Sequence, residues 1–152
     1  MDIDYTEYGG ILPFIRFIEE VLGDLTDGSH YFEFFDENMV MELPFHQPAT
    51  PAAITGRQMM IQAWKGYGNI ITLDHMSDLV TYRTEQPGVV ILTYQGHGVG
   101  TQTGIPYHQF YVSIVTIKDR KIVHWIDYSN PMQVLNTIGG ADAMAEAMYS
   151  EA

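Results

Sequence analysis

The stretch most informative about the fold reads Asp-Arg-Lys-Ile-Val-His-Trp-Ile-Asp-Tyr-Ser-Asn-Pro and spans residues 119–131. Asp119-Arg120 is typical of a tight turn, the next residues of a β-strand, and Asn130-Pro131 of a strand end. Because side chains alternate along a strand, Trp125 and Asp127 are expected on one face. A carboxylate beside a tryptophan is costly to bury unless something pairs with it or uses it. Asp127 is therefore the first candidate for chemistry; the alternative is an exposed aspartate near a strand end.

The rest of the chain divides into a helical front and a strand-rich back. Apolar residues at three- and four-residue spacing from Ile11 to Leu25 predict an amphipathic helix, and Gly56-Arg57 opens a second one. Other predicted elements are a helical turn at 31–35, strands at 38–43, 70–84, 89–100, 107–118 and 121–129, a loop at 44–55 and a helix at 132–138. This order predicts an α+β domain with helices packed on one face of a curved antiparallel sheet.

Composition limits the function. The 152 residues fit a single domain, 1–152, with a core at 8–140 and a tail at 141–152 that is either disordered or a lid or dimer contact. A net charge of −12 argues against nucleic acid and anionic membranes as partners. Without cysteine there is no disulfide, thiolate metal site or cysteine nucleophile. With no signal peptide pattern and no long apolar run, we expect a soluble cytoplasmic protein.

Three motifs resemble one superfamily. They are Ile54-Thr55-Gly56-Arg57, Leu92-Thr93-Tyr94-Gln95-Gly96-His97 and the Arg120 to Tyr128 stretch with its Trp-x-Asp-Tyr. Together with the order of elements from Tyr8 to Gly140, they resemble the nuclear transport factor 2-like superfamily. More narrowly, they are similar to SnoaL-like polyketide cyclases, ketosteroid isomerases and limonene epoxide hydrolases. The resemblance implies a cone-shaped barrel, formed by a curved mixed or antiparallel sheet with helices on its concave face, and a pocket between them. It also implies a homodimer formed through the outer sheet face, with His108, Tyr128 and His124 near the interface.

The resemblance assigns Asp127 to the aspartate that acts as acid or base in the epoxide hydrolases and SnoaL-like cyclases. The hydrolases pair this aspartate with Arg-x-Asp, where this chain has Gln95-Gly96-His97. They hold the nucleophilic water with Tyr-x-Asn, where this chain has Val40 and Glu42. Epoxide hydrolysis is therefore the third choice.

Strand parity extends the candidate site. Odd positions of strand 89–100 share one face, and Gly96, Gly98 and Gly100 leave the other face bare for a neighbouring backbone. With pleats aligned as the resemblance suggests, we expect one apolar cavity with a few polar groups. Its predicted lining is Gln95, His97, Val99, Gln109, Tyr111, Trp125 and Asp127, with Val40, Glu42, Phe14, Trp64 and His46 at its walls and mouth.

Such a set favours proton transfer. Burial would raise the pKa of Asp127 or Glu42 toward neutrality, and His97 titrates near pH 7. We expect Asp127 as principal acid/base, His97 as its partner or oxyanion donor, and Glu42 as a second acid/base. Each has an alternative structural reading, as a paired buried histidine for His97 and a solvent-facing carboxylate for Glu42.

The sequence thus predicts a cofactor-independent enzyme that enolises a small hydrophobic carbonyl compound, leading to cyclisation, isomerisation or dehydration. The alternative is a non-catalytic ligand-binding or dimeric interaction domain on the same scaffold. No metal is expected, because His75, His108 and His124 lack the spacing of a metal site.

Overall fold

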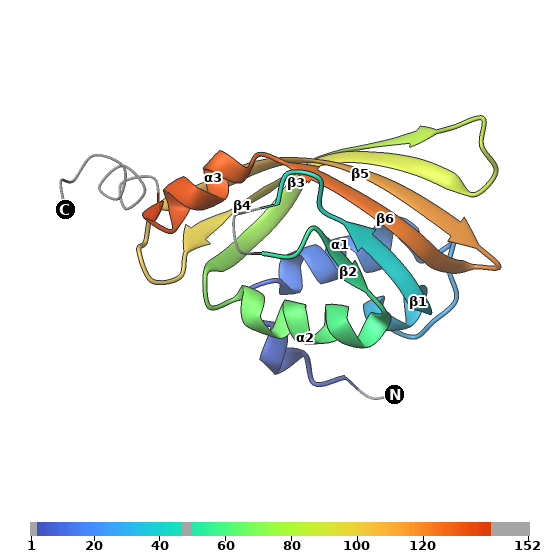
Figure 1. The fold of residues 1–152 in the computed structure, drawn as a ribbon, viewed down its shortest axis with the longest axis horizontal. Coiled ribbons are helices and arrows are strands. Elements are labelled where there is room, and N and C mark those ends of the chain that lie inside the picture. The colour runs from blue at the N-terminus through green and yellow to red at the C-terminus, as the bar shows by residue number, and fades with distance from the viewer. Residues whose placement is uncertain (1–2, 47–49, 141–152) are drawn as a thin grey trace.

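The computed structural model describes residues 3–46 and 50–140 (Figure 1). Its helices are η1 (Tyr5–Tyr8), α1 (Leu12–Leu22), η2 (Tyr31–Phe34), α2 (Arg57–Tyr67) and α3 (Pro131–Thr137). Its strands are β1 (Phe35–Glu42), β2 (Ala53–Thr55), β3 (Ile71–Arg83), β4 (Val89–Gly100), β5 (Pro106–Lys118) and β6 (Lys121–Ser129).

The strands form one six-stranded sheet in the order β2-β1-β6-β5-β4-β3. Strands β1 and β6 run parallel and the other neighbours antiparallel, so the sheet is mixed. Helices α1 and α2 lie on one side of the curved sheet (Figure 1). The predicted α+β class is confirmed, and the cone is open rather than a closed barrel because β2 and β3 are edges.

Most predicted elements are present, with two additions. The predicted bounds of β4 and β6 match the structure, while β1 begins earlier than expected. The segment predicted as a loop at 44–55 contains β2, a three-residue strand that pairs with β1 through Met41 and Ile54. A three-residue strand is too short to show periodicity. Helix η1 was not predicted either, and the predictions for 141–152 lie outside the described residues.

Helix α1 anchors the core beneath the sheet. Pro13 lies in its first turn, where a missing N–H is tolerated, and Ile15, Ile18 and Leu22 are fully buried. Each such side chain contributes roughly 1.5–3 kcal/mol through burial. The face of α1 directed at the sheet also places Phe14 against Trp125, with ring centroids 6.3 Å apart.

The inner face of β4 is the one predicted to be outer. Tyr94 pairs with Tyr111 and Gly96 with Gln109, so the even positions of β4 and the odd positions of β5 face the helices. A Cβ at Gly96 would lie 3.0 Å from Cε2 of Tyr111, and one at Gly98 would lie 2.2 Å from the Thr72 carbonyl oxygen. The glycines therefore make room for a tyrosine ring and for the close approach of the neighbouring strand β3.

A register shift corrects the predicted parity of β6 as well. Ile122 pairs with Ile117, but His124 pairs with Thr116, so the pairing skips a residue between them. Ile122 and Trp125 are consequently both buried although they are three residues apart. Beyond the shift, Trp125 and Asp127 face the helices as the sequence predicts.

Within residues 3–46 and 50–140, none of the helices combines the length and the apolar character that crossing a bilayer requires.

Candidate active site

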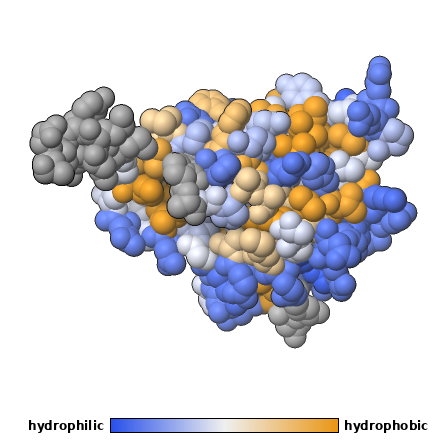
Figure 2. Space-filling view, in the orientation of Figure 1, coloured by the Kyte–Doolittle hydropathy of each residue, from blue (hydrophilic) through white to orange (hydrophobic). Residues whose placement is uncertain are grey.

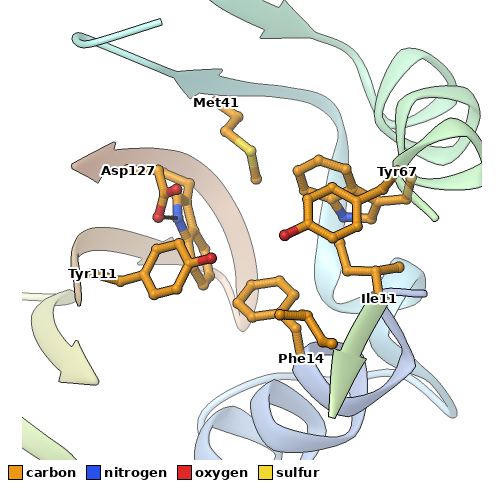
Figure 3. Close-up of a pocket in the computed structure, with 9 residues that line it drawn as sticks. Ile11, Phe14, Met41, Tyr67, Tyr111 and Asp127 are labelled. Atoms are coloured by element: carbon orange, nitrogen blue, oxygen red, sulfur yellow. Dashed lines mark hydrogen bonds between the residues drawn. The ribbon is translucent and has the colours of Figure 1, made fainter. Parts of the chain in front are cut away.

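A small cavity lies between the helices and the concave side of the sheet (Figure 3). Its volume is about 60 Å³. Its walls are almost entirely apolar or aromatic, and every major layer contributes: Ile11, Phe14, Met41, Trp64, Tyr67, Leu73, Tyr111, Trp125 and Asp127. Asp127 is the one carboxylate among these residues, so a half-buried acid meets an apolar hollow as the sequence predicts.

Two neighbours fix the Asp127 carboxylate. Ser113 Oγ donates to Oδ1 at 2.8 Å, and Trp125 Nε1 donates to the same oxygen at 3.2 Å. The Tyr94 hydroxyl lies 2.7 Å from Ser113 Oγ. Because the serine proton is directed at Asp127, Tyr94 donates to the serine. Neither bond to the carboxylate uses Oδ2, which leaves that oxygen for a ligand.

Burial sets the charge state of Asp127. It raises the pKa of this carboxyl to about 6, against the opposing effect of the hydrogen bonds from Ser113 and Trp125. Near pH 7 the group is therefore mostly ionised, yet it binds a proton far more readily than an exposed aspartate does. This is the balance that a general base or acid needs near neutrality.

Tyrosine hydroxyls face Asp127 across the cavity. The hydroxyls of Tyr67 and Tyr111 both point toward its centre (Figure 3), and the Tyr111 hydroxyl lies 2.8 Å from that of Tyr107. Burial raises the pKa of Tyr67 and of Tyr111 well above the usual value. Both hydroxyls therefore keep their protons near neutral pH and can donate hydrogen bonds to an oxygen that gains charge.

The structure brings together five of the residues predicted for the site: Phe14, Trp64, Tyr111, Trp125 and Asp127. Sequence reasoning missed the roles of Tyr67, Ser113 and Tyr94. Ser113 shares a strand face with Tyr111, a signal that was present, whereas Tyr94 was hidden by the reversed parity of β4.

The prediction that His97 shares the cavity with Asp127 is wrong. His97 lies on the outer face of the sheet, where its Nε2 is 2.7 Å from Ser77 Oγ. Its ring stacks between those of His75 and His108, at centroid distances of 4.3 and 4.7 Å. Within the described part of the chain, no group of histidine and acidic side chains is placed to hold a metal ion.

Gln95 and Val99 follow His97 to the outer face because they share its parity. The Gln95 side-chain oxygen lies 2.7 Å from His108 Nε2, and Val99 is 42% exposed. Neither lines the cavity, contrary to the prediction.

Val40 and Glu42 are also directed away from the cavity. The buried face of β1 carries Met39 and Met41, so the alternate residues point outward. Glu42 Oε2 lies 2.5 Å from Nε2 of His124 on the neighbouring strand. Glu42 therefore does not enter from the first strand as predicted.

Gln109 and His46 complete the corrections. Gln109 is fully buried, but its amide is occupied by the backbone of Asn130, donating to the carbonyl at 2.8 Å and accepting from the N–H at 3.0 Å. It thereby fixes the junction between β6 and α3. His46 is exposed after β1, with Nδ1 3.2 Å from the Leu43 carbonyl oxygen, and is not among the residues that line the cavity.

Comparisons with known proteins agree with this architecture. No protein-family model matches the chain. The uncharacterized protein YesE of Bacillus subtilis is 32% identical over 120 residues, which cover 79% of this chain and 82% of YesE. A crystal structure of a candidate isomerase from Bacillus subtilis is 29% identical, with a TM-score of 0.72, and the match covers 91% of this chain and 97% of that one.

More distant structures share the fold. An NTF2-like protein from Burkholderia xenovorans has a TM-score of 0.64 at 13% identity, covering 88% of this chain and 96% of its own. A candidate polyketide cyclase from Xanthomonas campestris has a TM-score of 0.62 at 15% identity, covering 87% and 96%. The chain therefore has the nuclear transport factor 2-like fold, an open cone of six strands with a cavity beneath two helices. It belongs to the same protein family as YesE of Bacillus subtilis.

Proposed function

We propose that this protein is an acid/base enzyme that enolises a small, largely apolar carbonyl compound without a cofactor. The observation that carries the proposal is the ionisable Asp127 at the wall of an apolar cavity, with a pKa raised to about 6 by burial. Relatives described as a candidate isomerase and a candidate polyketide cyclase support the same reaction class.

In this mechanism Asp127 removes a proton from the carbon next to the carbonyl, and Oδ2 receives it. The carbonyl oxygen, which gains negative charge, accepts a hydrogen bond from the hydroxyl of Tyr111 or Tyr67. These tyrosines take the oxyanion role that the sequence assigned to His97. The Ser113 and Trp125 hydrogen bonds hold Oδ1, so the working oxygen keeps one orientation.

Three outcomes are open to the enolate. It can be reprotonated by Asp127 at a second carbon, which moves a double bond. It can attack a second carbonyl within the substrate, which closes a ring, and the new alkoxide takes the proton from Asp127. It can also expel a hydroxyl from the β-carbon, which leaves as water with the proton from Asp127 and completes a dehydration.

The test is turnover by matched variants on a panel of small cyclic and acyclic ketones, with deuterium exchange at the α-carbon as the first readout. Wild-type protein should exchange α-protons and Asp127→Asn should not, while Glu42→Gln, which changes a carboxylate on the outer face, should match the wild type. Equal exchange by wild type and Asp127→Asn would contradict the proposal.

Ligand binding without turnover is the second candidate. The observation that favours it is the cavity volume of about 60 Å³, which leaves little room for a substrate to rearrange. Binding of ketones with no α-proton exchange in the wild-type protein would select this candidate over the first.

We also propose that the outer face of the sheet forms a homodimer. Although the chain carries 19 acidic residues, β4 and β5 contain none. Their outer face exposes Val99, Val112 and Phe110, the last at 60% exposure. Figure 2 shows that hydrophilic and hydrophobic residues alternate over the visible side of the molecule. The part of the outer face that β4 and β5 form carries no acidic side chain, so two chains of net charge −12 can meet there with least repulsion.

Sedimentation of the wild type and of Phe110→Glu tests the homodimer. A dimeric wild type and a monomeric variant are expected. A monomeric wild type at tens of micromolar protein would contradict it.

A further inference from the structure

The charge of the cavity is unbalanced. Among the described residues that line it, Asp127 brings a negative charge, and none is an arginine, lysine or histidine. Burial and the hydrogen bonds from Ser113 and Trp125 account for its pKa, with no ionised neighbour among the causes. Among residues 3–46 and 50–140, the carboxylate therefore has no counter-ion in its apolar hollow.

Aromatic rings make up most of the remaining wall. Phe14, Trp64, Tyr67, Tyr111 and Trp125 come from two helices and two strands and surround the hollow (Figure 3). In a cavity of about 60 Å³ a ligand atom near the centre lies close to all of its walls. Organic cations are attracted to aromatic rings within about 6 Å, most strongly to tryptophan, and more strongly where water is excluded.

These two properties call for the same kind of ligand. A neutral ligand would leave the buried carboxylate uncompensated, whereas a compact cation would neutralise it and contact the rings at once. Anions are disfavoured by the carboxylate itself. Large cations are disfavoured by the size of the hollow.

We infer that the cavity binds a small protonated amine, with its nitrogen between Asp127 and the aromatic rings. Resting on the proposed function, the substrate class becomes a carbonyl compound that carries a basic nitrogen. A positive charge next to the carbonyl makes the α-proton more acidic and partly neutralises the enolate. This gain offsets the lower basicity that the nearby ammonium gives Asp127, in a cavity whose described lining residues include no cationic side chain.

A matched pair of probes tests the inference without any turnover. Methylammonium and methanol have nearly the same shape, and only the first is charged. Trp64 and Trp125 are the two tryptophans of the chain and both line the cavity, so intrinsic fluorescence reports binding directly. At pH 8 the cation should bind at least about tenfold more tightly than the alcohol, a ratio that corresponds to about 1.4 kcal/mol.

The preference should depend on Asp127. It should fall toward unity in Asp127→Asn and persist in Glu42→Gln. In the wild type it should also decline between pH 7 and pH 5, because Asp127 gains a proton in this range while Tyr67 and Tyr111 stay neutral. The pH series keeps the test valid if the Asn variant folds poorly. The alcohol, measured at each pH, corrects for protonation of histidines outside the cavity.

Equal or tighter binding of methanol by the wild type at pH 8 would overturn the inference, as would a preference that survives Asp127→Asn. These results are separable from those on catalysis. Loss of α-proton exchange in Asp127→Asn without any cation preference removes the inference and keeps the proposed function. A cation preference without α-proton exchange in the wild type or in any variant removes the proposed function and keeps the inference that the cavity binds a protonated amine.

Discussion

The two faces of the same three strands have opposite chemistry. On the concave side of β4, β5 and β6, the buried Tyr94 and Ser113 form a hydrogen-bonded chain with the half-buried Asp127. On the convex side, His97 and His108 stack with His75 in contact with solvent. The two sets of residues occupy alternate positions along the strands. A shift of one residue would exchange them, so strand parity decides which polar groups can reach a ligand in the cavity.

Burial also acts on the two sides in different ways. On the inside it raises the pKa of Asp127 to about 6. On the outside, partial burial lowers the pKa of His97, and His75 and His108 lower it further. The inner group thus becomes a stronger base than usual, while the outer group becomes a weaker one. This contrast supports the proposed proton-transfer role of the inner face and the proposed contact role of the outer face.

The largest expected effect is on catalysis by the inner face. Replacing a positioned general base typically lowers the rate by about 10²–10⁴-fold. Asp127→Asn should therefore lose at least about a hundredfold in kcat for α-proton exchange, because the amide cannot accept the proton. Steady-state exchange rates followed by NMR measure this. Activity within threefold of the wild type would place the chemistry elsewhere.

Asp127→Asn should lower the exchange rate but raise the stability of the folded chain at a pH where the carboxylate is ionised. Because the pKa of Asp127 in the folded chain, about 6, exceeds the ordinary 3.8, the folded state binds this proton more tightly than the unfolded state does. The stability gained is fully present below pH 3.8 and is lost as the pH rises through 6. At about 1.4 kcal/mol per unit of pKa difference, the ionised carboxylate costs on the order of 3 kcal/mol.

Asp127→Asn should accordingly raise the free energy of unfolding at pH 8, by up to about 3 kcal/mol, with little gain at pH 4. Urea denaturation at the two pH values measures the difference. A variant that is less stable than the wild type at pH 8 would show that the ionised carboxylate does not destabilise the folded chain.

The sequence predicts the fold well because its signals are local and repeated. The long strand runs place β4 to β6 to within one residue, and the periodic apolar residues locate α1, which ends at Leu22, three residues before the predicted end at Leu25. The inward orientation of Asp127 is also predictable, since the Trp-x-Asp spacing places it on the face of a buried tryptophan.

The inner face of β4 was not predictable in the same way. Its inward residues include three glycines, and glycine gives no hydrophobic signal to mark a buried face. The outward His97 and Gln95 looked like site residues because they are polar and flank the glycines. The contacts that decide the matter, between Gly96 and Tyr111 and between Gly98 and β3, join residues far apart in the sequence.

A smaller effect is expected from the groups that hold Asp127. Ser113→Ala removes a hydrogen bond to the ionised form, so the pKa of Asp127 should rise further above 6, by roughly one unit. The acidic limb of the pH–rate profile should move upward by the same amount. Tyr94→Phe, which removes the donor to Ser113, should move it less. An unchanged profile in both variants would argue that Ser113 only fills space.

The smallest expected effect is on the outer face. His97→Ala should change α-proton exchange by less than about twofold, because the ring lies on the opposite side of the sheet from the cavity. A drop of more than tenfold with dimerisation intact would break the assignment of roles to the two faces.

The most direct test of the central claim is the titration of Asp127 itself. Carbon-13 NMR of the side-chain carboxyl groups, with Asp127→Asn used to assign the resonance, gives its pKa in the folded chain. A midpoint near 6 is the result that burial in an apolar cavity predicts. A midpoint at or below 3.8 would show a carboxylate stabilised by water or by a positive charge, and would contradict the account.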